Sequence, residues 1–187
     1  EICHEALLST AKISKPFRKF FIQTMKLFLS IPKRINFTQM ARFSGMNEGT
    51  FRQNFKKKFD WLGFNSHFAS GREGHRIAIA IDPSYISKSG GKTPGIGYFW
   101  SGCAQRVKRG LEILGFALVD ADEHDAVFLN AQQTIVEKKV GRVPNCIKGM
   151  DDSDSLVGLY LRAINKIEKT LHKLSDIIVA DAFFSKE

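Results

Sequence analysis

Two aspartates, each at the end of an apolar strand-like run, are the residues of this chain best suited to chemistry. Asp82 ends the run that begins at Arg76, and Asp181 ends the run that begins at Asp176. Both runs are short and rich in isoleucine, valine and alanine, which predicts buried strands. Carboxylates that end two neighbouring strands offer oxygen ligands to divalent cations, which activate a hydroxyl and stabilise a leaving oxygen. We therefore expect Asp82 and Asp181 to be the catalytic and metal-binding residues of a phosphoryl-transfer site.

The charge of the chain favours a nucleic-acid partner. The sequence has 187 residues, 43% of them hydrophobic, and a formal net charge of +9. Residues 1–70 hold 12 Lys and Arg against 4 Asp and Glu, whereas residues 71–187 are nearly neutral. A basic region followed by a near-neutral body predicts a DNA-binding region joined to a catalytic domain. A solvated basic surface that only aids solubility is the alternative.

Other features argue against a membrane or secreted protein. No apolar run approaches the roughly 20 residues that span a bilayer, and no secretory signal is visible. The cysteines, Cys3, Cys103 and Cys146, are far apart and form no C-x-x-C pair. That usage is typical of reduced thiols, so we expect a cytoplasmic protein with no membrane partner.

Residues 1–70 are predicted to be helical, with a helix-turn-helix-like DNA-binding region. A short helix capped by Asn36, a Gly-containing turn at 44–46 and a second helix capped by Asn47 give that pattern. The second helix has apolar residues at helical spacing: Phe51, Phe55, Phe59 and Leu62. Its outward residues expected to contact DNA are Arg52, Lys56 and Lys57. A helical subdomain with a solvated lysine face is the alternative.

Residues 71–187 are predicted to form an α/β domain with a mixed sheet. A Gly- and Ser-rich linker at 63–75 precedes it. The expected strands are 76–82, 96–100, 110–119, 128–134 and 176–180, and the expected helix is 155–174. A strand after that helix can return beside the first strand, which would bring Asp82 and Asp181 together. The acidic residues after the third strand, Asp120, Asp122 and Asp125, are interpreted as a solvated turn.

A basic segment lies between Asp82 and Glu112, where the sequence has no acidic residue. Its cations are Lys88, Lys92, Arg106, Lys108 and Arg109. The aromatic residues interleaved with them are Tyr85, Tyr98, Phe99 and Trp100. So close to two catalytic aspartates, the segment is predicted to bind a DNA strand. The alternative is a hairpin with ordinary surface cations, and for Phe99 and Trp100 core packing is the favoured interpretation.

Three segments resemble DDE-type transposases of bacterial insertion sequences. The run Ile79-Ala-Ile-Asp82-Pro-Ser-Tyr-Ile-Ser-Lys88 is similar to the first-aspartate motif of that family, and Ile178-Val-Ala-Asp181-Ala-Phe-Phe-Ser-Lys186 is similar to the second. The segment Gly95–Glu112 resembles the stretch that follows the first motif. The two aspartates are 99 residues apart, which is acceptable for the family. The resemblance covers about residues 76–187, and more loosely 36–62.

The resemblance implies an RNase H-like catalytic fold, Mg²⁺ or Mn²⁺ as cofactor, nicking at transposon ends and strand transfer to target DNA. It implies DNA as partner, a homo-oligomer in the DNA complex, and a bacterial, nucleoid-associated location. It also implies a third carboxylate, a glutamate on a later helix. Glu187 is only six residues past Asp181 and is not given that role. We therefore expect a truncated transposase that is inactive alone.

Two other interpretations stay open. The chain could be a non-transposing RNase H-like nuclease, which would share the two aspartates and the metal. It could also be a DNA-binding protein whose second domain is catalytically inactive.

Overall fold

The computed structural model describes residues 2–10, 13–90, 93–135 and 155–181, Phe184, and the backbone of 146–148. The chain forms two compact units, Glu1–Phe68 and Ala69–Glu187. Their boundary lies two residues before the one expected at 70/71. Among the residues described, none of the helices is both long and apolar enough to cross a membrane.

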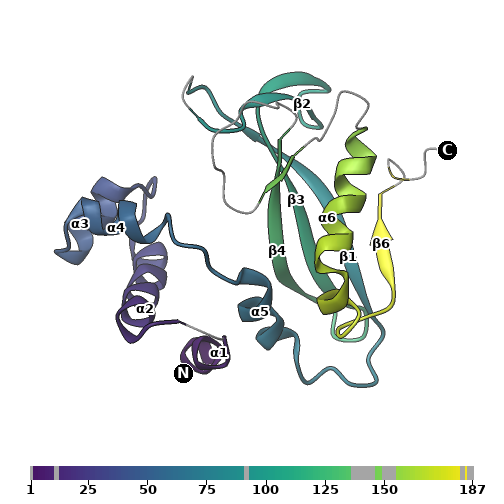
Figure 1. Ribbon diagram of the computed structural model, residues 1–187, viewed down its shortest axis with the longest axis horizontal. Coiled ribbons are helices and arrows are strands. Elements are labelled where there is room, and N and C mark those ends of the chain that lie inside the picture. The colour runs from purple at the N-terminus through teal and green to yellow at the C-terminus, as the bar shows by residue number, and fades with distance from the viewer. Residues whose placement is uncertain are drawn as a thin grey trace. The chain divides into compact units, whose positions relative to one another are not determined.

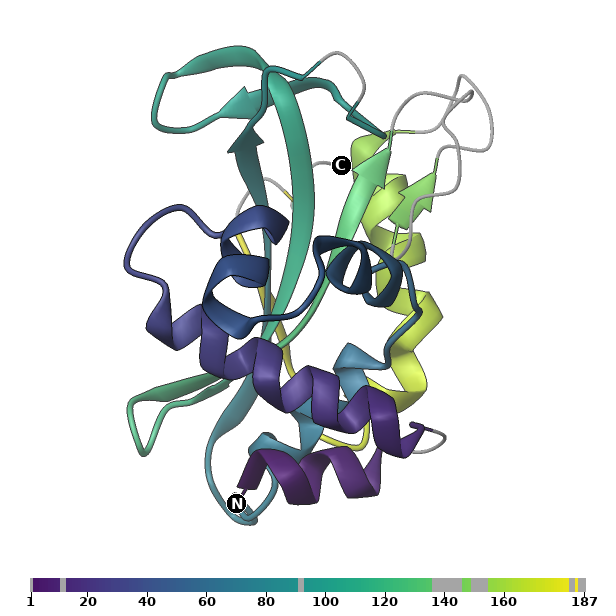
Figure 2. The same cartoon turned by 90° about the vertical axis from the view of Figure 1, so that its left-hand side faces the viewer.

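The first unit is helical throughout its described part (Figure 2). Its helices are α1 (Ile2–Ser9), α2 (Lys15–Ser30), α3 (Phe37–Ser44), α4 (Glu48–Asn54) and α5 (Trp61–Ser66). The 3-10 turn η1 (His67–Ala69) follows at the boundary between the units. Four of the helices begin at a side chain that accepts a hydrogen bond from a backbone N–H of the first turn, and these caps are Ser14, Asn36, Asn47 and Asp60. Such caps satisfy donors that have no partner inside a helix, which sets where each helix starts.

Phenylalanine side chains build two small cores in this unit. One core surrounds Phe21 and Phe64, where the ring of Phe59 stacks on that of Phe21 with centroids 4.8 Å apart. The other core surrounds Met40 and Phe51, which are fully buried. The phenylalanines expected on a single helix are therefore shared between two cores. The prediction of one long second helix is wrong, because α4 ends at Asn54 and Phe59 lies beyond it.

The second unit is a six-stranded mixed sheet with one helix in its described part (Figure 1). The strands are β1 (Ile77–Ser87), β2 (Gly97–Ser101), β3 (Arg106–Asp120), β4 (Asp125–Ile135), β5 (Cys146–Lys148) and β6 (Ile178–Ala180), and the helix is α6 (Leu156–Leu171). Their order is β5-β4-β3-β1-β6, and β2 pairs with one end of β3. The expected mixed α/β sheet is confirmed, with β6 returning parallel to β1.

Strand β3 organises the sheet. Its even-numbered residues from Gly110 to Asp120 are buried, and the residues between them are partly exposed. The alternation follows from the two-residue period of a strand with one face on the core. Helix α6 covers the buried face, since Gln132 of β4 donates to the backbone oxygen of Ala163. Two hairpins lie at opposite ends of β3, β2–β3 at one end and β3–β4 at the other (Figure 2).

Two predicted boundaries were wrong for identifiable reasons, and one strand was missed. Strand β1 continues five residues past Asp82 to Ser87, paired with β3. Pro83 has no backbone N–H to donate. It is tolerated there because β6 ends at Ala180, so beyond Ile81 no residue of β6 needs a donor from β1. The linker expected at 63–75 begins inside α5, where the side chain of Asp60 caps the helix. Strand β5 was not predicted.

Candidate functional site

Asp82 and Asp181 directly follow the last paired residues of the parallel strands β1 and β6. The register pairs Ile79 with Ile178 and Ile81 with Ala180. Asp82 is the next residue of β1, and Asp181 directly follows the end of β6. Neighbouring strands lie about 4.8 Å apart. The pairing of the two segments is thus as expected (Figure 1). Whether their carboxylates share a metal ion stays a prediction.

Both aspartates are exposed, so neither carries the desolvation cost of a buried charge. The hydroxyl of Ser84 donates to Asp82 Oδ2 at 3.1 Å, which restrains that carboxylate. The backbone oxygen of Asp181 accepts from the N–H of Phe184 at 3.0 Å. Two exposed carboxylates at the ends of neighbouring strands offer the hard oxygen ligands that Mg²⁺ and Mn²⁺ prefer. They could supply some, but not all, of the ligands of such an ion.

A buried polar pair that sequence reasoning missed lies near Asp82. The hydroxyl of Tyr160, on α6, donates to Glu112 Oε1 of β3 at 2.6 Å. Burial raises the pKa of the Glu112 carboxyl. The hydrogen bonds that the carboxyl accepts lower this pKa, but by less than burial raises it. Burial also raises the pKa of the Tyr160 hydroxyl, and the charges of Glu112 and Asp82 raise it further. The sequence did contain one indication of this pair. Glu112 is an acidic residue at a position where the alternation of the strand predicts burial.

Tyr160 connects the helix to the region of the two aspartates. Its ring lies 5.4 Å, centroid to centroid, from that of Phe184, three residues past Asp181. Burial and the hydrogen bond to Glu112 raise the pKa of its hydroxyl most, and the charge of Asp82 adds the smallest contribution. Tyr160 was predicted only as part of an apolar helix stripe. In the structure its hydroxyl fixes α6 against β3.

The described residues hold no ready-made cluster of three metal-ligating side chains. Within 2–10, 13–90, 93–135 and 155–181, no group of three or more His, Cys, Asp or Glu side chains is arranged to hold a metal ion. Asp120 pairs with Ile77, five residues before Asp82 on β1, which is roughly 16 Å along the strand. Glu187 lies outside the described residues.

The basic residues predicted to bind a DNA strand gather at the β2–β3 hairpin and the end of β1. Lys88, Arg106 and Arg109 are exposed and Lys108 is half-buried. Lys92 lies outside the described residues. Phe99 is buried, as expected, but Trp100 is exposed, so the interpretation of Trp100 as a core residue is wrong. The reason is the alternation of β2, which turns Phe99 inward and its neighbours outward.

In the helical unit, helix α3, the left-handed residue Gly45 and helix α4 form the expected helix, turn and helix. Arg52 is paired with Glu48 one turn earlier and lies 5.4 Å from the centre of the Phe37 ring. Lys56 and Lys57 were expected on the second helix, but they follow its end at Asn54. Both are exposed.

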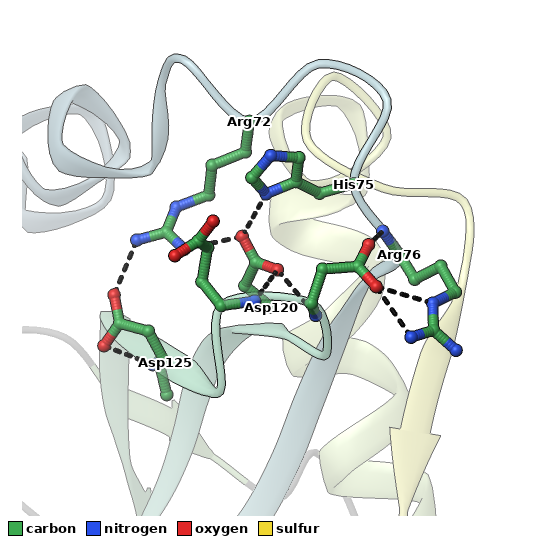
Figure 3. Close-up of polar contacts among 8 residues, drawn as sticks. Arg72, His75, Arg76, Asp120 and Asp125 are labelled. Atoms are coloured by element: carbon green, nitrogen blue, oxygen red, sulfur yellow. Dashed lines mark hydrogen bonds and ion pairs between the residues drawn. The ribbon is translucent and has the colours of Figure 1, made fainter.

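A network of charges joins the segment before β1 to the β3–β4 turn (Figure 3). The carboxylate of Asp120 is fully buried and accepts from Arg72 Nη1 at 2.8 Å, and it lies 2.7 Å from His75 Nδ1. Arg72 also pairs with Asp125, at 2.7 Å, and Arg76 pairs with Asp122, at 2.7 Å. The interpretation of this turn as solvated is therefore wrong for Asp120. Cations from 45 or more residues earlier compensate its charge.

Comparisons of this chain with protein-family models, with curated proteins and with solved structures found no match. The candidate site is therefore argued from its own geometry. That geometry consists of the aspartate pair on β1 and β6, the buried pair beside it, and the basic hairpin at one end of β3.

Proposed function

We propose that this chain carries the catalytic domain of a DDE-type insertion-sequence transposase, which cuts and joins DNA phosphodiesters by two-metal chemistry. The observation that supports the proposal is the parallel register of β1 and β6, whose last pair, Ile81 and Ala180, directly precedes Asp82 and Asp181. The sheet supports an RNase H-like fold: β1, β3 and β4 run antiparallel in chain order, and the strand after α6 lies parallel to β1.

In this proposal Asp82 and Asp181 hold a divalent cation between them, and Ser84 orients the carboxylate of Asp82. A bound Mg²⁺ or Mn²⁺ would supply Lewis-acid activation of the attacking and leaving oxygens. Lys88, Arg106 and Arg109 are exposed and offset the charge of DNA phosphates. A homo-oligomer that brings two DNA ends together and a location on the bacterial nucleoid belong to the same proposal.

The helical unit is proposed to bind DNA mainly through phosphates. Changing both Lys56 and Lys57 to alanine should weaken binding to all duplex sequences alike and reduce the slope of log K against log salt by roughly one unit per lost contact. Fluorescence anisotropy over a series of salt concentrations measures the slope. Lys33→Ala, an exposed lysine between α2 and α3, is the control. A slope unchanged in the double variant would leave these lysines with no DNA contact.

The 187-residue chain should bind duplex DNA but not nick or join it with Mg²⁺. The physical reason is that in-line displacement needs ions at both the attacking and leaving oxygens, and two carboxylates are too few ligands to position them. Conversion of supercoiled plasmid to nicked circles is the measurement. Nicking that disappears on Asp82→Ala would show that a third ligand lies within this chain, and Glu187→Gln would then be tested first.

Metal binding separates the proposal from an inactive DNA-binding protein. That alternative predicts DNA binding with no cation held by Asp82 and Asp181. A non-transposing nuclease predicts the same metal site, but cleavage without strand transfer. A joining assay on labelled DNA ends distinguishes those two enzymes.

A further inference from the structure

The β2–β3 hairpin has one buried face and one exposed face, and the exposed face is aromatic. Tyr98 pairs with Arg109, and Trp100 pairs with Val107. Directly opposed residues of paired strands, and residues two apart on one strand, point to the same side of a sheet. The exposed fractions are 73% for Tyr98, 57% for Trp100 and 57% for Val107.

The other face of the hairpin is packed inward. Phe99 is 3% exposed and Ser101 is 5% exposed. A β-carbon added to Gly97 would come within 3.1 Å of the ring of Phe99, so the buried ring lies directly against the start of β2. Burial of Phe99 therefore fixes which way Tyr98 and Trp100 point.

Hydrogen bonds hold the exposed face in place. Tyr85 of β1 donates its hydroxyl to the backbone oxygen of Arg109 at 2.8 Å. Arg109 Nη1 donates to the backbone oxygen of Ser89 at 3.3 Å. In the turn, Gln105 has a positive φ of 48°, and its side chain donates to the backbone oxygen of Gly102 at 2.6 Å. The two rings are thus presented by a fixed hairpin, which lowers the entropy lost when a ligand binds.

The charge around the rings indicates a nucleic acid. Arg109 is exposed on the same face as its partner Tyr98, the exposed Lys88 follows the end of β1, and the sequence between Asp82 and Glu112 contains no acid. An apolar protein partner would not require this concentration of cations, whereas a DNA strand presents a phosphate beside each base. Aromatic rings with neighbouring arginines form stacking platforms for bases.

Stacking on exposed rings favours unpaired nucleotides over paired ones. Residues two apart on a strand are separated by about 6.7 Å. In a duplex the faces of the bases are covered by their neighbours, so a side-chain ring gains a base face only where the nucleotide is single-stranded, frayed or flipped out. Arg109 pairs with Tyr98 of β2 and lies six residues along β3 from Gly115, the partner of Asp82. This places the exposed face roughly 20 Å from the aspartate pair.

We propose that the exposed face of the β2–β3 hairpin binds unpaired nucleotides of the DNA strand, with bases stacked on Tyr98 and Trp100 and phosphates held by Arg109 and its neighbouring cations. The proposal rests on the proposed function for its biological substrate, but its binding test does not require catalysis.

The test compares single-stranded and duplex DNA on the full chain. Anisotropy of a labelled oligodeoxythymidylate of about 12 nucleotides, a length in the range such sites cover, gives the single-strand affinity. Changing both Tyr98 and Trp100 to alanine should weaken that affinity at least about tenfold, and should change duplex affinity less than about threefold. Changing both to phenylalanine keeps two rings and should restore single-strand binding to within about threefold of wild type.

A second measurement reads the contact directly. The chain has two tryptophans, Trp61 and Trp100, so Trp61→Phe leaves Trp100 as the sole reporter. Oligodeoxythymidylate should quench its fluorescence in the Trp61→Phe variant. Absence of quenching, or equal losses for single strand and duplex in the double-alanine variant, would overturn the proposal. A change in oligomeric state with unchanged DNA binding would also overturn it, in favour of a protein interface.

The two proposals fail separately. Asp82→Asn should weaken Mn²⁺ binding at least about tenfold yet leave quenching of Trp100 unchanged. Quenching without metal binding in the wild-type chain would contradict the catalytic proposal alone. Metal binding at Asp82 without quenching would contradict the stacking proposal alone.

Discussion

Replacing Asp82 or Asp181 by asparagine is expected to weaken Mn²⁺ binding by this chain at least about tenfold. Loss of even a supporting group around a metal ion costs roughly 10- to 100-fold in affinity, and a direct ligand should cost no less. Asparagine keeps the size of the side chain and one oxygen, so the change removes mainly the negative charge. Isothermal titration calorimetry with Mn²⁺ measures the effect.

Asp176→Asn is the matched control. Asp176 lies five residues before Asp181, its side chain is 85% exposed, and it pairs with His172 rather than with β1. We expect Mn²⁺ affinity within about twofold of wild type, because a single exposed carboxylate is a weak site. If the two aspartates share one ion, the double variant should lose little more than either single variant. Wild-type affinity in both single variants would contradict the shared site.

Asp120→Asn should lower the Tm of the second unit by roughly 10 °C, since removing one member of a buried charge network leaves its partners uncompensated. The carboxylate of Asp120 is fully buried and also accepts from the N–H groups of Asp122 and Glu123 at 3.0 and 3.1 Å. Asp122→Asn removes an exposed pair with Arg76 and should lower Tm by less than about 3 °C. Equal losses of Tm in the two variants would show that the buried carboxylate of Asp120 stabilises the fold no more than the exposed carboxylate of Asp122 does.

The same network makes stability depend on pH in a defined direction. The carboxylate of Asp120 raises the pKa of His75, so the charged imidazole stabilises the fold fully below about pH 6.5 and loses that contribution as pH rises through the raised pKa. His75 and the nearby backbone N–H groups hold the pKa of Asp120 far below its usual range, so its own contribution is complete above about pH 4 and is lost as the pH falls through the lowered pKa. The Tm difference between wild type and His75→Gln should therefore shrink as the solution is made alkaline. A difference that grows would contradict the assigned pair.

Local patterns predicted most of the sheet because its central strands are apolar and bounded by Gly, Pro and Asp. The run that ends at Asp181 is β-branched and short, and it forms β6 beside β1 as expected. The end of β1 was missed because Pro83 usually ends a strand. Here it lies where β1 has no hydrogen-bonded neighbour on the β6 side among the described residues.

Other features depend on residues far apart in the sequence. Asp120 looks like a surface acid in its own turn, and only the approach of Arg72 and His75 makes its burial favourable. The helical period of Phe51, Phe55 and Phe59 suggested one helix, although these side chains serve different cores. Trp100 was assigned to the core by residue type, while its neighbour Phe99 fills that position. The errors at Asp120 and at the phenylalanines come from tertiary contacts that no local pattern encodes, whereas at Trp100 the alternation of β2 decides which ring is buried.

Iron-directed cleavage of the polypeptide tests the aspartate pair most directly. Fe²⁺ binds the same oxygen ligands as Mn²⁺, and with ascorbate and peroxide it generates radicals that cut the backbone near the ion. We predict cuts close to residues 82 and 181, suppressed by excess Mn²⁺, absent in Asp82→Asn and Asp181→Asn, and retained in Asp176→Asn. Cuts at only one of the two positions, or at neither, would contradict a metal site shared by β1 and β6.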